Sequence, residues 1–101
     1  MIIEFSVVPL GKGPSISPII ARVLKIVTES GLRYKANPMG TVLEGEWAQV
    51  MNVVKQCHDE ALKEADRVLT SIKVDDYKGK EDRIEKKLES VERKLGMKLN
   101  T

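Results

Sequence analysis

The stretch LRYKANPMGTVLEGEW, residues 32–47, is the most informative part of the chain, because it holds two runs of β-type residues separated by a breaker. Residues 32–36 alternate apolar and polar side chains, Asn37 and Pro38 interrupt the alternation, and TVLEGE, residues 41–46, resumes it. This pattern predicts a β-hairpin with a longer loop. The rest of the fold depends on what flanks this hairpin.

The segment before the hairpin predicts a strand and then a helix. Residues 2–9, IIEFSVVP, are rich in β-type residues and alternate at first. Ser17 followed by Pro18 is typical of an N-cap with proline at the first helical position, and Gly31 is typical of a helix end. We therefore expect a helix between Ser17 and Gly31.

The segment after the hairpin predicts a helix, a strand and a final helix. Apolar residues recur at helical spacing from Trp47 to Ala61, and RVLTSIKVD, residues 67–75, is a β-type run. Residues 80–96 predict a C-terminal helix with a single narrow apolar stripe. The stripe consists of Ile84, Leu88, Val91 and Leu95.

The order of elements predicts the fold class. Two right-handed crossovers and a hairpin give an α+β, ferredoxin-like βαββαβ sandwich with a four-stranded antiparallel sheet, extended by the C-terminal helix. A chain of 101 residues with 42% hydrophobic residues supports one domain, so residues 1–101 are predicted to form a single domain.

Composition excludes several classes of partner and site. A net charge of +2, with both signs well represented, disfavours nucleic acid. No apolar run reaches the roughly 20 residues of a membrane span, and the start of the chain lacks a signal peptide's basic region and cleavage site. One cysteine excludes an intramolecular disulfide. We therefore expect a soluble, cytoplasmic protein with no membrane partner.

Alternation along the strands assigns the two faces of the predicted sheet. The helices are expected to cover Ile3, Phe5, Val7 and Leu43, and also Val68, Ile72 and Val74 of the fourth strand. The opposite, open face then carries Glu4, Ser6 and Glu44 near its middle and Lys73 with Arg33 or Lys35 on the flanking strands. A solvated face with cross-strand ion pairs is favoured over a ligand site on this pattern alone.

No motif in the chain supports catalysis or a metal site. Cys57 and His58, in CHDE, lie within a predicted helix at a spacing that sends them to different faces, so Cys57 is interpreted as core and His58 as helix surface. The Gly11–Gly13 turn lacks the lysine and hydroxyl spacing of a P-loop. No nucleophile is placed beside a base, which argues against an enzyme.

Three stretches together resemble a known family. They are VVPLGKG with Ser15 and Ser17, RYKANPMGTVLEGEW, and DRVLTSIKVDD followed by KKLESVERKL. In this order, and over the whole chain, they resemble the thiamine-binding protein family, with a departure at Tyr77, where an arginine is expected. The resemblance implies a ferredoxin-like fold, sheet-mediated dimers that assemble into tetramers, and binding of thiamine or its hydroxymethylpyrimidine half without catalysis or a cofactor.

The resemblance also implies which side chains meet the ligand. Glu44 can accept from the pyrimidine amine and offset the thiazolium charge, while Met39 offers a polarizable wall beside Gly40 of the same motif. Ser6, Ser17 or Thr41 can supply a hydroxyl, and Lys73 suits a phosphate group or neutralises a nearby glutamate.

The function predicted from the sequence is therefore non-catalytic binding of a thiamine-like molecule by a homo-oligomer, either a dimer or a tetramer, that acts as carrier, sensor or buffer. Two alternatives stay open. One is a regulatory module that binds another small ligand, such as an amino acid or an anion, at a subunit interface. The other is a purely structural oligomer with a solvated or interface-buried sheet face.

Overall fold

A computed structural model describes all 101 residues as three helices and four strands. The elements, in chain order, are β1 (Ile2–Leu10), α1 (Ser17–Glu29), β2 (Arg33–Asn37), β3 (Gly40–Glu44), α2 (Trp47–Leu62), β4 (Arg67–Asp75) and α3 (Arg83–Leu95). No helix is long and apolar enough to cross a membrane.

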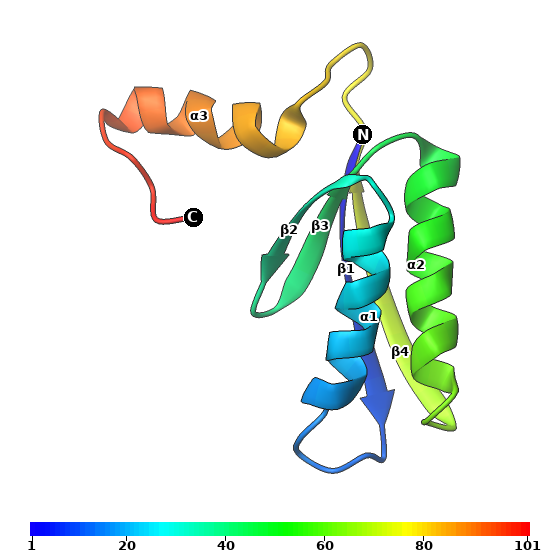
Figure 1. Ribbon diagram of the computed structural model, residues 1–101. Helices are drawn as coiled ribbons and strands as arrows, with labels where there is room; N and C mark the ends of the chain where they lie inside the picture. Colours follow the sequence, from blue (N-terminus) through cyan, green and yellow to red (C-terminus); the bar gives the residue numbers. More distant parts are fainter.

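The four strands form one antiparallel sheet in the order β2-β3-β1-β4, with α1 and α2 covering one of its faces (Figure 1). This is the predicted βαββαβ arrangement with an additional C-terminal helix, so the α+β fold prediction is confirmed. The fourth strand has the predicted bounds, and the second helix begins at Trp47 as predicted.

The core lies between the sheet and the two helices, and it is almost entirely aliphatic. Its largest fully buried side chains are Ile3, Leu43, Val27, Val50 and Cys57. Burial, with a smaller contribution from Glu60, raises the pKa of the Cys57 thiol to about 11, so the thiol stays protonated at neutral pH. Cys57 is therefore a core residue, as interpreted from the helical spacing.

The outer edge of the sheet is less well covered than the alternation implied. Ile72 and Val74 lie opposite Phe5 and Ile3 in the β1–β4 register and so share their face, but they are 43% and 38% exposed. The reason is that β4 is an edge strand, whereas the most deeply buried strand residues, Ile3 and Leu43, belong to the two central strands.

Several boundaries differ from those predicted by a residue or more, and three of the differences have a clear local reason. Ile16, not Ser17, is the N-cap of α1, and its carbonyl accepts from the N–H groups of Ile19 and Ile20. The third strand ends at Glu44, because Glu46 already caps α2 and its N–H donates to Gln49 Oε1 at 3.0 Å. The last helix begins at Arg83 rather than residue 80, because Asp82 adopts a left-handed backbone conformation (φ 55°).

The sheet is four strands wide at one end and narrows toward the other. β1 pairs with β4 along its whole length, from Ile2 to Leu10, but its ladder with β3 ends at the Phe5–Thr41 pair. In Figure 1 the β2–β3 hairpin stops well short of the far ends of β1 and β4. Beyond Phe5, β1 therefore has an unpaired edge on the side where β3 pairs with its first half.

The hydrogen bonding of this ladder identifies which peptide groups face the free edge. The Met1 amino group donates a hydrogen bond to the Gly45 carbonyl at 3.2 Å, and the Gly45 N–H donates one to the Met1 carbonyl at 3.1 Å. Since hydrogen-bonded pairs recur every second residue along an antiparallel ladder, Ile3 and Phe5 also direct their N–H and C=O groups toward β3. The next residue to do so is Val7, which has no partner in the β1–β3 register.

Candidate functional site

A pocket of about 350 Å³ lies where the hairpin ends, between the free edge of β1, the first half of α1 and the β2–β3 turn. We call it the hairpin pocket. Its lining is mainly apolar and consists of Phe5, Ser6, Val7, Val8, Ile16, Ile20, Val23, Leu24, Asn37, Pro38, Met39, Gly40 and Thr41.

Four of the seven residues predicted to bind the ligand line the hairpin pocket. They are Ser6 of β1, Met39 of the turn, and Gly40 and Thr41 at the start of β3. Thr41 is a buried residue, 7% exposed, whose hydroxyl forms no hydrogen bond within the protein, while Met39, 89% exposed, lies at the rim. The pocket therefore combines a hydroxyl without a protein partner and a soft apolar rim.

Gly40 keeps the turn close to β1. A Cβ atom at this position would lie 3.2 Å from the Phe5 carbonyl oxygen, which is tighter than ordinary contact, and 3.4 Å from Glu4 Cγ. Glycine therefore favours the close approach of the two strands, and no unusual backbone conformation is involved. This approach sets the position at which the ladder ends and the pocket begins.

Ser17 and Lys73 do not line the hairpin pocket. Ser17 is exposed at the first turn of α1. Lys73 is exposed on β4, where it lies opposite Glu4 across the β1–β4 ladder. The structure therefore does not bring these two side chains together with the other four.

Glu44 lies on the open face of the sheet, as the alternation predicted, but its carboxylate is occupied by the start of α3. It accepts from the backbone N–H of Arg83 at 2.7 Å and from that of Ile84 at 3.3 Å. The side chain thereby supplies acceptors for the otherwise unpaired donors of a helix N-terminus. Arg33, the neighbour of Glu44 in the β2–β3 register, adds ion pairs to Asp82 and Glu85.

His58 is partly buried, not simply a helix-surface residue. Its Nδ1 shares a 2.7 Å hydrogen bond with Thr70 Oγ1, which ties α2 to β4. The sequence alone could not predict this contact, because it does not show which residues of α2 lie opposite which residues of β4.

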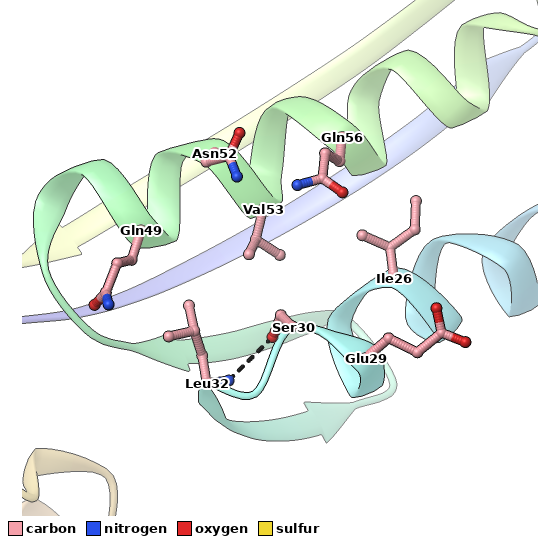
Figure 2. A pocket seen from close by; sticks show the side chains of 8 residues that line it. All are labelled: Ile26, Glu29, Ser30, Leu32, Gln49, Asn52, Val53 and Gln56. Carbon is pink, nitrogen blue, oxygen red and sulfur yellow. Dashed lines mark hydrogen bonds between the residues drawn. The ribbon is translucent and has the colours of Figure 1, made fainter.

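A second pocket, which sequence reasoning missed, lies between α1 and α2 at the end where α1 stops; Figure 2 shows its lining. We call it the helix pocket. It has a volume of about 400 Å³ and is lined by three carboxamides of α2, Gln49, Asn52 and Gln56, over apolar side chains. The remaining residues are Ile26, Glu29, Ser30, Leu32 and Val53. In the sequence, these carboxamides are spaced three and four residues apart, which places them on one face of α2 and could have indicated a polar site there.

The chain matches the family model described as "Thiamine-binding protein" over residues 3–92. It is 37% identical over 91 residues to the UPF0045 protein MJ1052 of Methanocaldococcus jannaschii, covering 90% of this chain and 91% of the relative. It is 38% identical over 96 residues to the UPF0045 protein Mb1933 of Mycobacterium bovis, covering 94% of each.

The fold is also similar to a solved structure. The crystal structure of MJ1052 superimposes with a TM-score of 0.84 at 38% identity, over 89% of this chain and 93% of that one. The agreement in sequence, in element order and in three-dimensional structure covers nearly the whole chain. The chain therefore belongs to the thiamine-binding protein family.

Proposed function

We propose that the protein binds the aminopyrimidine half of thiamine, or free hydroxymethylpyrimidine, in the hairpin pocket without catalysing a reaction. The observation that carries the proposal is the end of the β1–β3 ladder at Phe5 and Thr41, which leaves the Val7 peptide group facing a mainly apolar pocket. Family membership supports thiamine-like molecules as the class of ligand. The shape and lining of the hairpin pocket support this pocket as the binding site.

The polar groups of the pocket suit an aminopyrimidine. Such a ring presents an amino donor beside ring-nitrogen acceptors, and a free strand edge offers a C=O acceptor and an N–H donor. Val7 supplies both groups, and the Thr41 hydroxyl and the Asn37 carboxamide add adaptable partners. The surrounding side chains, among them Ile20 and Val23, provide the apolar walls that a flat ring requires.

The charge of the pocket indicates which half of thiamine enters it. No carboxylate and no lysine or arginine lines the hairpin pocket, so a buried thiazolium cation would lose its hydration without gaining a counter-ion. The neutral pyrimidine therefore occupies the pocket, and the thiazolium lies at the rim near the exposed Met39 side chain.

Calorimetric titration tests this proposal with thiamine, hydroxymethylpyrimidine and thiamine monophosphate as separate ligands. We expect all three to bind, with hydroxymethylpyrimidine retaining most of the affinity of thiamine, because the pocket recognises the shared ring. Thr41→Val removes one pocket hydroxyl while keeping the shape, so it is expected to weaken binding about fivefold to tenfold, the value of one neutral hydrogen bond.

A matched pair of serines provides the control. Ser6 and Ser71 lie directly opposite each other in the β1–β4 register, but only Ser6 lines the pocket. Ser6→Ala should weaken binding and Ser71→Ala should not. Absence of heat with all three ligands would overturn the proposed function, and loss of binding in Asn52→Ala with none in Thr41→Val would place the ligand in the helix pocket instead.

We further propose that the protein works as a homo-oligomer, either a dimer or a tetramer. Support comes from apolar side chains that the subunit leaves uncovered: Leu69 is 58% exposed on the open face, and Val91 and Leu95 on α3 are 44% and 56% exposed. Exposed apolar side chains of this kind are typical of assembly contacts.

Truncation after Lys80 tests the role of α3 in assembly. We expect the truncated protein to contain fewer chains per particle than the full-length protein at the same concentration, from the light-scattering mass divided by the mass of one chain. Leu62→Ala on α2, which alters an exposed leucine away from both surfaces, should leave the number of chains per particle unchanged. An unchanged number of chains after truncation would mean that α3 packs only within its own subunit.

A further inference from the structure

A third pocket, of about 270 Å³, lies between α3 and the open face of the sheet. We call it the α3 pocket. It is distinct in chemistry from the hairpin pocket, because three of its lining residues are cationic and none is acidic. Its lining consists of Ile2, Lys35, Asn37, Val42, Arg83, Ile84, Lys87, Leu88, Asn100 and Thr101.

The three cations come from two elements and are only partly neutralised. Lys35, on β2, forms no ion pair, whereas Arg83 and Lys87 of α3 share the single carboxylate of Asp75, at 3.8 and 2.6 Å. The hydrogen bond from Lys87 lowers the pKa of Asp75, so this carboxylate is ionised at neutral pH. The nearby Glu44 carboxylate is engaged by the N–H groups of Arg83 and Ile84. Cationic charge therefore remains unpaired at this pocket.

Arg83 is held in place but incompletely satisfied. Its guanidinium carbon lies 5.0 Å from the centre of the Tyr77 ring, in a cation–π contact, and its side chain is only 17% exposed. Its Nε atom is buried and has no hydrogen-bond partner. A buried guanidinium N–H without an acceptor is costly, so Arg83 is not fully paired within the protein.

The rest of the surroundings favours an anion with an apolar body. Val42, Ile84 and Leu88 supply the apolar surface of the pocket. Glu85, Glu89 and Glu92 of α3 do not line the α3 pocket. They line an adjoining cavity, which shares Lys35, Ile84 and Leu88 with it. The α3 pocket thus places cations and an aliphatic wall within one small volume.

We propose that the α3 pocket binds a phosphate monoester whose organic part is compact and apolar. A phosphate monoester carries about two negative charges at neutral pH, which suits a pocket where Lys35 is unpaired and where Arg83 and Lys87 share the Asp75 carboxylate. Arg83 and Lys87 contact the phosphate oxygens from α3 and Lys35 contacts them from β2, while the organic part lies against Ile84 and Leu88. Binding also draws α3 toward the sheet, because the ligand contacts both.

Titration of the isotope-labelled protein with phenyl phosphate, followed by backbone amide shifts in NMR spectra, tests the proposal. We expect saturable shifts centred on Val42, Ile84 and Leu88. Inorganic phosphate is expected to bind more weakly because it lacks the apolar part, and phenol is expected to cause no saturable shift. Lys35→Gln should weaken phenyl phosphate binding about tenfold, the effect of one charge-assisted contact.

The matched control is Lys86→Gln. Lys86 is adjacent to Lys87 on the same helix but lies outside the pocket, and it pairs with Asp82. Its substitution should change the affinity less than twofold. Equal effects of the two substitutions, shifts spread over all surface lysines, or no saturable shift would each overturn the proposal. The α3 pocket shares Asn37 with the hairpin pocket but contains neither Val7 nor Thr41. The effects of Lys35→Gln on phenyl phosphate and of Thr41→Val on thiamine therefore distinguish failure of this proposal from failure of the proposed function.

Discussion

Leu43→Ala is expected to lower the free energy of unfolding by about 3–5 kcal/mol, the range for a fully buried leucine whose cavity cannot collapse. Leu43 is 0% exposed, and its strand, β3, is one of the two central strands. Its side chain belongs to the same buried cluster as Val27 of α1 and Val50 of α2. A small domain has about 5–15 kcal/mol of total stability, so this loss is a large fraction of the whole.

Chemical denaturation followed by far-UV circular dichroism measures this loss. Leu62→Ala is the matched control, because Leu62 is 42% exposed at the end of α2 and leaves no closed cavity. We expect it to cost less than about 1 kcal/mol. Similar losses in the two variants would contradict the layered core, since the fold assigns one leucine to its centre and the other to its surface.

Glu44→Ala is expected to release α3 from the sheet. The substitution removes both acceptors of the Arg83 and Ile84 N–H groups, which corresponds to about 1–2 kcal/mol for a charged cap. α3 has 13 residues, none of them buried, and a helix of this length is marginal in water without tertiary contacts. A small loss of docking energy should therefore reduce helix content substantially.

Two measurements detect the release of α3. Far-UV circular dichroism of Glu44→Ala should approach that of the chain truncated after Lys80, and trypsin should cleave faster at Lys86 and Lys87. Glu4→Ala is the control, because Glu4 lies on the same face, next to Val42 in the β1–β3 register, without an ion pair. If both variants keep the native spectrum and protease resistance, the Arg33 ion pairs are sufficient to hold the helix.

The fold was predictable because its signals are local. The alternation in residues 67–75 predicted β4 to the residue, and the apolar spacing from Trp47 predicted α2. The boundaries that were wrong depend on backbone conformation. Nothing in the composition of residues 80–83 shows that Asp82 turns left-handed and delays the last helix, or that Ile16 and not Ser17 caps α1.

The candidate site was only partly predictable because it depends on long-range contacts. Met39, Gly40 and Thr41 are contiguous, and strand pairing places them beside Ser6, so one motif was sufficient to gather these four. The α1 residues of the hairpin pocket, such as Ile20, have the apolar side chains and helical spacing of ordinary core residues, so the sequence does not mark them as pocket residues. The use of Glu44 as a cap for α3 could not be foreseen, because its partners are about 40 residues away and are backbone groups.

The unequal lengths of the strands have a consequence for how the hairpin pocket can vary among relatives. The hairpin pocket occupies the space beside β1 that β3 does not reach. The length of the β2–β3 hairpin therefore sets the volume of the pocket. A longer hairpin would pair with Val7 and fill the cavity with its own backbone, whereas a shorter one would open it to solvent. Insertions and deletions at Pro38 and Met39 would therefore change ligand size without altering a single core residue.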